Sequence, residues 1–403
     1  METTDIAFLM AGDLHRNIRA LKQLRSISDG GYTVKTFHLG NTTGNPRPAT
    51  PLPNGVSEEI VRLNPGSGPR YFKALGLAFK DAVSNHSATL FHASDLYTLP
   101  AAAWVAKREG AAYSFDSREL YAHVAATKGR PWVRLWWYWM ERRLLPGAAC
   151  VFTVSDSIAD RLAKTYHITR PIVVHNAPEA GAAAKNPPHL GLSPDDLGNV
   201  HPQTMHNLLG DRGLPSHVPI LVHLGQMKKN RGCENLILAM KLVPKAHLVF
   251  LGFGPLEVKL RELVASNNLQ SSVHFLPAVP PRAVHTALKG ATIGVTMLED
   301  TCLNHRFALP NKFFDYIHAG LPILSSNLKE VAALVEQYEL GLTTDPSDPN
   351  GIAQAINQMI DSPSLTDWGQ NAVRTSETFS WDKATQRFMH EINRIFSSLR
   401  ATQ

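Results

Sequence analysis

The sequence predicts an α/β protein of two doubly wound domains, each built on a parallel sheet. Three observations carry this prediction. The chain has 403 residues, which is too long for one ordinary core, so two domains are the natural expectation. Short apolar runs alternate with helical stretches along the chain, which is the order of βαβ units. Residues 177–215, rich in Ala, Pro, Gly and Asn, separate two such series.

The first half of the chain alternates short strands with helices. Apolar or β-branched runs predict strands at residues 6–10, 33–39, 88–93, 111–116, 150–155 and 172–176. Helices are expected between them at residues 15–28, 71–85, 100–109, 132–145 and 157–166. In open α/β sheets, ligands bind at the carboxyl ends of the strands, so the loops that follow these strands are the candidates for a site.

The second half repeats the pattern. Strands are expected at residues 219–225, 246–252, 272–278, 292–297, 322–326 and 341–344. Helices are expected at 233–242, 255–267, 281–289, 311–319, 328–337 and 350–361. A last helix, 381–399, carries apolar residues at helical spacing, and we expect it to pack back onto the first domain.

The domain boundaries follow from these elements. We expect an N-terminal domain at 1–180, a linker at 181–214, a C-terminal domain at 215–378 and the closing helix at 379–403. The active site is expected in the cleft between the two domains.

Composition is that of a soluble globular enzyme, with 44% hydrophobic and 18% charged residues. No apolar run approaches the ~18 residues that span a bilayer, and the N-terminus does not resemble a signal peptide. Three widely spaced cysteines imply neither disulfides nor a zinc site and favour a reducing cytoplasm. The net charge of +6 favours anionic partners, which include phosphorylated small molecules, lipid headgroups and nucleic acid, without choosing among them.

The stretch 299–324 is the most informative segment. A polar loop ends in Leu309-Pro310-Asn311-Lys312, and a short amphipathic helix then runs to Gly320. A helix N-terminus beside a lysine favours phosphate, and Asp315, one turn further on, can accept two ribose hydroxyls. The stretch predicts a nucleotide diphosphate site. An ordinary helix with one surface lysine fits the local pattern equally well.

Two further loops of the second half suit a diphosphate. Lys228, Lys229 and Arg231 follow Gly225 at a strand-to-helix turn, where a solvated basic loop is the alternative interpretation. Gly252-Phe253-Gly254-Pro255 follows the next strand. Its glycines permit either close approach of backbone to a ligand or a tight turn.

Three polar loops follow strands of the first half. They are Gly12-Asp13-Leu14-His15-Arg16, His92-Ala93-Ser94-Asp95 and Asp116-Ser117-Arg118-Glu119. All three are expected at carboxyl ends of strands, where sites gather. Each also contains a good helix-capping residue, which is the alternative explanation.

The segment from Trp132 to Arg143 holds four of the seven tryptophans beside three arginines. An aromatic, basic helix of this kind can dock on an anionic membrane surface. A helix packed between a sheet and solvent shows the same pattern.

Taken in order, these motifs resemble glycosyltransferase family 4, the retaining nucleotide-sugar enzymes with the two-domain GT-B fold. The similar segments run almost end to end. They are GDLHRNIRALKQL, FHASDLYTLPAAAWVAKREGAAYSFDSRELY, VFTVSDSIADRLAKTYHITRPIVVHNAP, HLGQMKKNRGCENLILAM, LVFLGFGPLEVKL, SVHFLPAVPPRAVHTAL and LPNKFFDYIHAGLPIL.

The resemblance implies roles for individual residues. Arg231 and Lys312 are the expected catalytic cations, which stabilise the leaving diphosphate. The donor is expected to contact Gly12, Gln226, Lys228, Gly254, Leu309, Pro310, Asn311 and Asp315. The acceptor or the transferred sugar is expected to contact His15, Asp95, Arg118, Glu119, Asn304 and His305. Retention by front-face displacement requires no protein nucleophile, no metal and no cofactor.

Four positions depart from the family pattern. Phe307 stands at the first position of E-x7-E, where a glutamate contacts the sugar, and Asp315 stands at the second. Asn304, His305 and Arg306 are the candidates for the missing sugar contact. Gln226 replaces a basic residue, and Arg118 replaces a histidine.

The expected function is transfer of a hexose from a UDP- or GDP-linked sugar to a hydroxyl of a glycan, lipid-linked or small-molecule acceptor. We expect a cytoplasmic, metal-independent enzyme with no nucleic-acid partner and with peripheral contact to an anionic membrane as a possibility. One alternative is a GT-B epimerase or phosphorylase. Another is a catalytically degenerate protein that binds a glycan or a partner enzyme, for which Phe307 is the main support.

Overall fold

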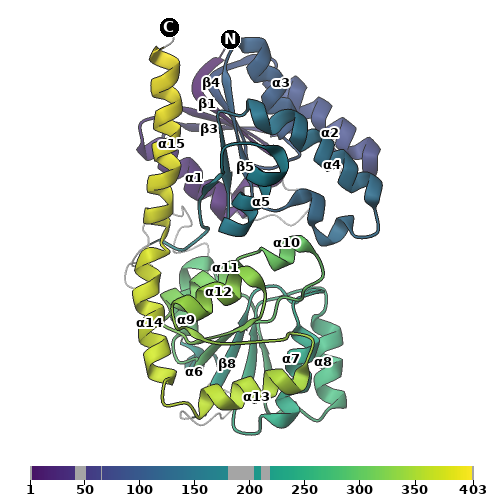
Figure 1. Cartoon of the computed structure of the whole chain (residues 1–403), viewed down its shortest axis with the longest axis vertical. Helices are drawn as coiled ribbons and strands as arrows, with labels where there is room; N and C mark the ends of the chain where they lie inside the picture. Colours follow the sequence, from purple (N-terminus) through teal and green to yellow (C-terminus); the bar gives the residue numbers. More distant parts are fainter. Residues whose placement is uncertain (1, 41–50, 65, 180–203, 210–217, 402–403) are drawn as a thin grey trace. The chain divides into compact units, whose positions relative to one another are not determined.

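The structure is a computed structural model that describes residues 2–40, 51–64, 66–179, 204–209 and 218–401 (Figure 1). The chain divides into two compact units, and each has its own parallel sheet. Unit 1 takes the described residues within Met1–His175 and Asp382–Gln403. Unit 2 takes those within Asn176–Pro188 and Leu197–Trp381. The predicted fold class, two doubly wound Rossmann-like domains, is confirmed.

The sheet of unit 1 has seven strands in the order β3-β2-β1-β4-β5-β6-β7, and all neighbours pair in parallel. The order places β1 between β2 and β4, so loops that follow these three strands meet at one edge. The strands are β1 Glu2–Met10, β2 Val34–Leu39, β3 Val56–Val61, β4 His86–Ala93, β5 Ala112–Ser117, β6 Cys150–Thr153 and β7 Ile172–Val173.

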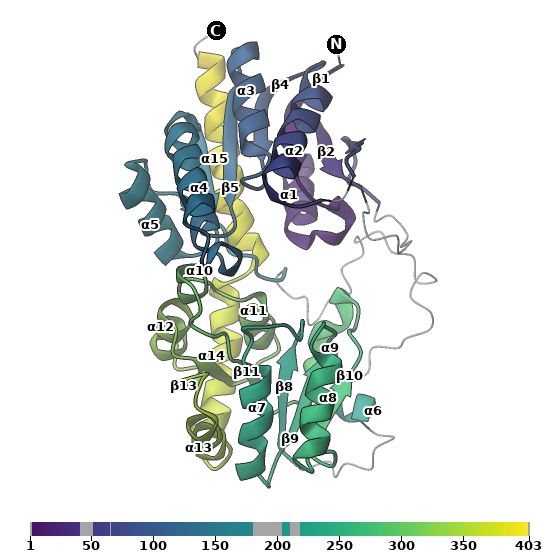
Figure 2. The same ribbon diagram turned by 90° about the vertical axis from the view of Figure 1, so that its right-hand side faces the viewer.

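Helices cover the sheet of unit 1, and the last helix of the chain is one of them (Figures 1 and 2). Phe388 of α15 is fully buried, with its ring centroid 4.9 Å from that of Phe152 and 6.1 Å from that of His92. The helices are η1 Leu14–Arg16, α1 Ile18–Asp29, α2 Gly68–Val83, α3 Leu99–Glu109, η2 Tyr121–His123, η3 Ala125–Thr127, α4 Pro131–Leu144, η4 Leu145–Gly147, α5 Asp156–Tyr166 and α15 Trp381–Ala401.

The sheet of unit 2 has six parallel strands in the order β10-β9-β8-β11-β12-β13. Apolar clusters cover both faces, which explains why these strands are continuous apolar runs. The strands are β8 Ile220–Leu224, β9 His247–Leu251, β10 Val273–Leu276, β11 Ile293–Thr296, β12 Ile323–Ser326 and β13 Gly341–Thr344. The helices are α6 Met205–Leu209, α7 Cys233–Ala239, η7 Met240–Leu242, α8 Glu257–Ser266, η8 Pro281–Ala283, α9 Val284–Leu288, α10 Leu303–Arg306, α11 Asn311–His318, α12 Lys329–Gln337, α13 Pro349–Ile360 and α14 Leu365–Thr378.

The predicted linker contains an element that sequence analysis missed. Residues 205–209 form α6, and Met205 and Leu209 are buried in the apolar cluster of unit 2. The hydrophobic gain from these side chains attaches this short helix to the core. Residues 181–203 and 210–214 of the predicted linker lie outside the described part of the chain.

Tyr316 fixes α11 against the sheet of unit 2. A Cβ on Gly294 would lie 2.4 Å from the Tyr316 ring, so only glycine leaves room for it. The hydroxyl accepts from the Leu224 N–H at 3.0 Å and lies 2.9 Å from the Val222 carbonyl oxygen and 3.0 Å from that of Val295. Because this buried hydroxyl is tied to two strands, the first turn of α11 has a defined position.

None of the described helices combines the length and the apolar character needed to span a membrane.

Candidate active site

Two strand-to-helix loops of unit 2 are packed backbone against backbone. The Met227 N–H donates to the Phe253 carbonyl at 2.9 Å, and the Gly225 N–H donates to that of Leu251 at 2.8 Å. A Cβ on Gly254 would lie 2.1 Å from the Met227 carbonyl oxygen. Only glycine fits this approach. Gly254, a predicted donor contact, is therefore required by the fold itself, and it holds the loop after β8 in place.

Lys312 lies in the first turn of α11 and meets a buried histidine. Its Nζ is 3.0 Å from Nε2 of His223, a residue of β8 that is fully buried. The ammonium donates and the imidazole accepts, so the geometry calls for a neutral His223. Burial holds the pKa of His223 well below its usual range, and the charges of Lys312 and Arg231 add to this effect. The Sγ of Cys233 lies 3.8 Å from the same nitrogen.

Positive charge converges around Lys312. Burial, together with the charge of Arg231, lowers the pKa of Lys312 to about 7 against the opposing influence of Cys233 and Asp315. Burial also lowers the pKa of His305, and Arg231 and Lys228 act in the same direction. Two loops and the first turn of α11 therefore place cationic groups close enough to repel one another. A bound polyanion would reduce this repulsion.

The loop that carries His305 is tied to the loop that carries Arg231. Glu299 Oε1 accepts from the Gly232 N–H at 3.2 Å, and the Glu299 N–H donates to the Asn230 carbonyl at 3.2 Å. Gly232 has φ +64°, and a Cβ there would lie 2.4 Å from a backbone oxygen. His305 Nδ1 lies 3.1 Å from the Glu299 carbonyl. The glycine and the glutamate thus set the separation of the two loops.

The positions of the E-x7-E pattern have other neighbours. Asp315 Oδ1 lies 3.8 Å from Nε2 of His285, and its side chain is 24% exposed, which leaves a face for a ligand. The ring of Phe307 receives the Lys329 ammonium 5.4 Å from its centroid. At the first position of the E-x7-E pattern, this chain therefore has an aromatic ring in contact with a lysine instead of the glutamate carboxylate of the pattern.

The other predicted donor residues differ in exposure. Gln226 and Asn311 are exposed, Lys228 and Pro310 are partly exposed, and Leu309 is buried. Asn304, predicted to contact the sugar, is also buried.

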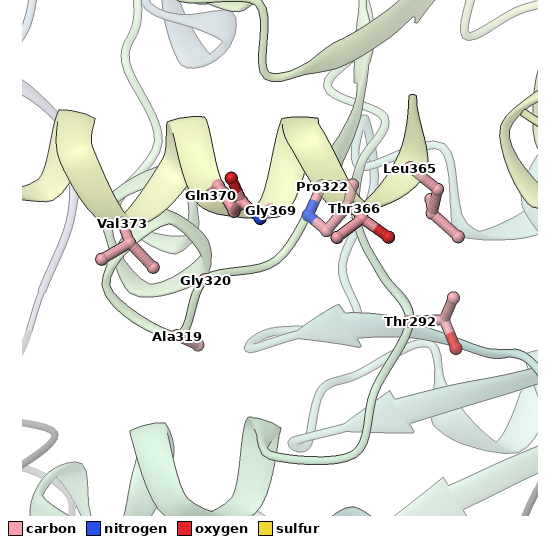
Figure 3. Close-up of a pocket in the computed structure, with 9 residues that line it drawn as sticks. All are labelled: Thr292, Ala319, Gly320, Pro322, Leu365, Thr366, Gly369, Gln370 and Val373. Atoms are coloured by element: carbon pink, nitrogen blue, oxygen red, sulfur yellow. The ribbon is translucent and has the colours of Figure 1, made fainter. Parts of the chain in front are cut away.

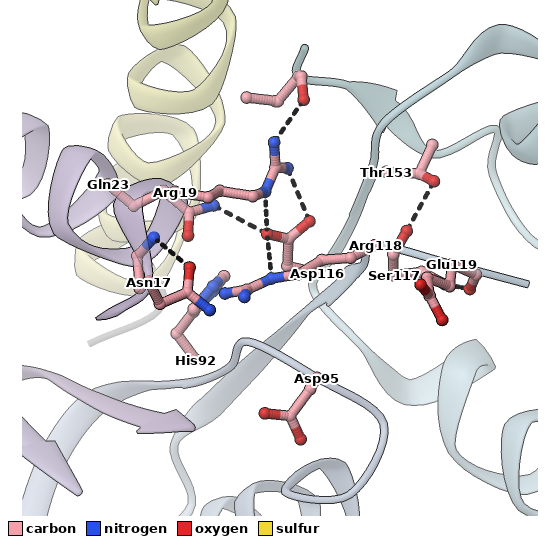
Figure 4. Close-up of polar contacts among 12 residues, drawn as sticks. Asn17, Arg19, Gln23, His92, Asp95, Asp116, Ser117, Arg118, Glu119 and Thr153 are labelled. Carbon is pink, nitrogen blue, oxygen red and sulfur yellow. Dashed lines mark hydrogen bonds and ion pairs between the residues drawn. The ribbon is translucent and has the colours of Figure 1, made fainter. Parts of the chain in front are cut away.

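Unit 1 contains a second polar centre around Asp116, shown in Figure 4. Arg19 forms a two-pronged ion pair with this carboxylate at 2.7 and 2.8 Å, and Gln23 Nε2 donates to it at 3.0 Å. Burial would raise the pKa of Asp116, but the Arg19 ion pair outweighs it and holds that pKa well below the usual range. Arg118 Nε lies 3.5 Å from the same carboxylate. Its Nε and Nη2 are buried and have no hydrogen-bond partner among the described residues, so Arg118 has donors available for a ligand.

Asp95 organises backbone rather than facing outward. Its Oδ2 accepts from the Ala11 N–H at 2.7 Å, and its Oδ1 accepts from the N–H groups of Tyr97 and Thr98 at 3.0 Å each. The side chain is buried. It therefore connects the loop after β1, which carries Gly12, to the start of α3.

The remaining predicted residues of unit 1 lie in the segments that follow β1 and β5. A Cβ on Gly12 would have no heavy atom within 4 Å, so this glycine borders open space. Glu119 is exposed, and its carbonyl accepts from Ser117 Oγ at 3.1 Å. His15 Nε2 lies 3.0 Å from Glu58 Oε2.

Sequence analysis missed His223 and Arg19. A single histidine inside an apolar strand is typical of a core residue, and an arginine on an amphipathic helix is typical of a solvated face. The one available signal for His223 was its place two residues before Gly225, near the carboxyl end of a strand.

Unit 2 also has a cavity of about 460 Å³ beside α14, shown in Figure 3. Its lining residues are Thr292, Ala319, Gly320, Pro322, Leu365, Thr366, Gly369, Gln370 and Val373. None of these carries a charge, and none belongs to the predicted site, so the cavity does not suit a diphosphate.

The two Rossmann-like sheets and the cationic strand-to-helix loops define a GT-B glycosyltransferase architecture. Residues 17–177 match the family described as glycosyl transferase 4-like domain, and residues 218–362 match glycosyl transferases group 1. The chain belongs to the family 4-like glycosyltransferases of the GT-B fold, as the resemblance predicted.

Curated relatives match part of the chain. The lipopolysaccharide core biosynthesis glycosyltransferase LpsD of Rhizobium meliloti is 26% identical over 157 residues, 38% of this chain and 43% of the relative. The D-inositol 3-phosphate glycosyltransferase of Corynebacterium diphtheriae is 23% identical over 222 residues, 49% of this chain and 51% of the relative. The chain thus spans about half the length of the curated relatives it matches.

Solved structures match nearly the whole chain. Sucrose-phosphate synthase from Thermosynechococcus elongatus superposes with a TM-score of 0.77 at 16% identity, over 99% of this chain and 100% of the other. Anabaena HepE in complex with UDP-glucose superposes with a TM-score of 0.68 at 13% identity, over 99% and 100%. At these identities the similarity shows the fold.

Proposed function

We propose that this chain is a retaining, metal-independent glycosyltransferase. It moves a hexose from a UDP- or GDP-linked sugar to a hydroxyl of a glycan, lipid-linked or small-molecule acceptor. The observation that carries the proposal is the position of Lys312 in the first turn of α11, where its Nζ lies 3.0 Å from the buried His223. Burial and the charge of Arg231 lower the pKa of Lys312 to about 7. The positive charges around Lys312 repel one another. A diphosphate bound beside them removes this repulsion, which makes binding more favourable.

The roles of the residues follow from charge. Arg231 and Lys312 bind the diphosphate and stabilise the negative charge that grows on it as the bond to the sugar breaks. In front-face displacement, an oxygen of the leaving diphosphate accepts the proton of the attacking hydroxyl, so no protein nucleophile is required. Asp315, with its partly exposed carboxylate, accepts the ribose hydroxyls. The UDP-glucose held by HepE, which shares the fold, supports a nucleotide-sugar donor.

The experiment is titration of UDP and GDP with the variants Arg231→Ala and Lys312→Ala. Each should weaken binding by about 10- to 100-fold, because a hydrogen bond to a charged group contributes about 1.5–3 kcal/mol. Lys259→Ala is the matched control, since Lys259 is 68% exposed and pairs with Glu234 at 3.4 Å. Unchanged affinity in both site variants would refute the assignment.

The ring of Phe307, with Lys329 above it, favours one alternative, a degenerate transferase that binds its ligand without turnover. Transfer or hydrolysis of a nucleotide sugar by the purified chain excludes this alternative. Interconversion of nucleotide sugars without an added acceptor would instead identify an epimerase.

We further propose that α4 contacts an anionic membrane. Four large apolar side chains at i, i+3, i+4 and i+7 face solvent: Trp132 (67% exposed), Leu135 (69%), Trp136 (51%) and Trp139 (54%). Trp137 is buried, so it faces the protein interior. Exposed Arg142 and Arg143 end the helix and supply the charge that attracts anionic lipid.

Co-sedimentation with anionic liposomes at low salt tests this contact. Trp136→Ser with Trp139→Ser should reduce the bound fraction severalfold, since two stacked indoles leave the apolar stripe. Trp104→Ser is the control, because Trp104 is 40% exposed but covered by Arg108, whose guanidinium lies 4.8 Å from the ring centroid. A wild-type protein that stays in the supernatant at low salt contradicts the proposal, because electrostatic screening is weakest there.

A further inference from the structure

Two histidines and one glutamate meet at one edge of the unit 1 sheet. His15 belongs to η1 after β1, His38 lies near the end of β2, and Glu58 lies on the edge strand β3. Glu58 Oε2 lies 2.9 Å from His38 Nε2 and 3.0 Å from His15 Nε2. In the part of the chain that the structure describes, this is the one group of three such residues whose ligand atoms all lie within 4.8 Å of one another.

The hydrogen bonds of His38 require a positively charged group beside its second ring nitrogen, Nε2. Nδ1 lies 3.0 Å from the Leu39 carbonyl oxygen, which can only accept, so Nδ1 carries a proton. A neutral His38 would then direct the lone pair of Nε2 at the Glu58 carboxylate, which is repulsive. Either a second proton or a metal ion must lie there. His38 is 1% exposed, so its imidazole lies away from bulk water.

A metal ion resolves this arrangement. Histidines that bind metals usually donate their other ring N–H to a carbonyl or carboxylate, as His38 does to Leu39. Glu58 supplies a carboxylate oxygen that lies beside both imidazoles.

The distances suit a small divalent transition metal. Zinc binds imidazole nitrogen and carboxylate oxygen at about 2.0–2.2 Å, so tetrahedral ligands lie about 3.3 Å apart. The two contacts of Glu58, at 2.9 and 3.0 Å, would open by a few tenths of an ångström to admit the ion, and the two histidine ligand nitrogens lie within 4.8 Å of each other. The set of two imidazoles and one carboxylate matches the ligand preference of zinc, and three protein ligands leave a fourth position open.

We propose that His15, His38 and Glu58 bind one zinc-class divalent ion, which fixes the loop after β1 to strands β2 and β3. This inference goes beyond the proposed function, because the ion takes no part in sugar transfer. It assigns His15 to the metal rather than to the acceptor. It also gives the loop that carries Gly12 a point of attachment in addition to Asp95, which binds the Ala11 N–H.

The test uses the full-length chain without a histidine tag, stripped with a chelator and then titrated with Zn²⁺ and, separately, with Co²⁺. We expect one tight equivalent of Zn²⁺, a rise in melting temperature, and visible Co²⁺ absorption typical of a low-coordinate site. His38→Gln and Glu58→Gln should each weaken Zn²⁺ binding by at least 100-fold and abolish the Co²⁺ spectrum.

His247→Gln is the matched control. His247 Nδ1 lies 2.9 Å from His274 Nε2, and this second histidine pair has no third ligand group within reach among the described residues. The control should keep the full equivalent. The proposal is overturned if no stoichiometric binding occurs in the wild type, if both site variants bind like the wild type, or if the control alone loses the metal.

Nucleotide binding in the same samples separates folding from metal binding. The candidate diphosphate site lies in unit 2, so both metal-site variants should retain UDP or GDP affinity when folded. Glu58→Gln keeps its shape on an exposed edge strand and should fold normally. Loss of Zn²⁺ with retained nucleotide binding supports the metal site. Zinc binding without nucleotide binding leaves the metal site standing and counts only against the proposed transferase.

Discussion

Binding of a nucleoside diphosphate should be accompanied by proton uptake at Lys312. In the free protein, burial and the neighbouring Arg231 lower the pKa of this lysine to about 7. A diphosphate placed beside it favours the ammonium and returns the pKa toward its ordinary value near 10.4. Between pH 7 and pH 10 the bound lysine therefore carries a proton that much of the free protein lacks.

The magnitude follows from the two pKa values. With a pKa of about 7, roughly half of the free lysine is protonated at pH 7 and about one tenth at pH 8. Binding should take up about 0.5 proton at pH 7 and about 0.9 at pH 8. Because only the charged form binds well, affinity should fall about fivefold over this interval.

Neighbouring groups do not take up or release protons between pH 7 and pH 8. Burial raises the pKa of Cys233 to about 12, and burial, reinforced by Arg231 and Lys228, lowers that of His305 below its usual value. A terminal phosphate loses its last proton near pH 6, so the ligand does not titrate there either.

Calorimetric titration of UDP or GDP at pH 8, in two buffers of different ionisation enthalpy, counts the protons. Lys312→Arg is the control, because a guanidinium stays charged throughout. It should bind with no proton uptake and with an affinity that does not change between pH 7 and pH 8. Tight binding to the wild type with no proton uptake at pH 8 would refute the assignment of Lys312 to the diphosphate.

Three substitutions, one of them paired with a control substitution, test the framework around the sites. Burial raises the pKa of Glu141 to about 7. The native state therefore loses up to about 3 kcal/mol of stability as pH rises from about 4.5 to 7. Glu141→Gln should abolish this difference, measured by urea denaturation at pH 5 and pH 8. Gly254→Ala places a Cβ 2.1 Å from a backbone oxygen and should cost about 1–3 kcal/mol, whereas Gly76→Ala, in α2 with no atom within 4 Å, should stabilise slightly in the same thermal-melting assay. Asp116→Asn leaves Arg19 buried without its charge partner and should cost about 3–5 kcal/mol in chemical denaturation; a variant as stable as the wild type would contradict this account.

Elements with a strong local pattern were predictable. The predicted strand at 341–344 matches Gly341–Thr344, and the predicted helix at 157–166 matches Asp156–Tyr166 to within one residue. Two of the missed elements bury little. In β3, four of six residues are exposed, and in α14 only Ala372 and Thr375 are buried. An edge strand and a surface helix have weak apolar periodicity, so neighbouring elements decide their structure.

Tertiary pairing also changed the interpretation of individual residues. Asp95 had been grouped with the acceptor contacts, but its oxygens accept from three backbone N–H groups. Gly254 had two possible explanations, a ligand approach or a turn. The Met227 carbonyl 2.1 Å from its would-be Cβ shows a tight contact between two loops. Met227 is far from Gly254 in the sequence, so no local pattern could have revealed this contact.

By itself, the sequence determined the fold class, the positions of the strand-to-helix loops and the family, because periodicity, glycine and proline punctuation and motif order are local properties. Only the tertiary structure decided which side chains meet. Lys312 reaches His223 across 89 residues, Arg19 reaches Asp116 across 97, and His15 reaches Glu58 across 43. These contacts depend on strand order, which places β8 beside β11 and β1 beside β2. That order arises from burial of whole sheets rather than from any short segment. It brings charged residues that are distant in the sequence together in each site.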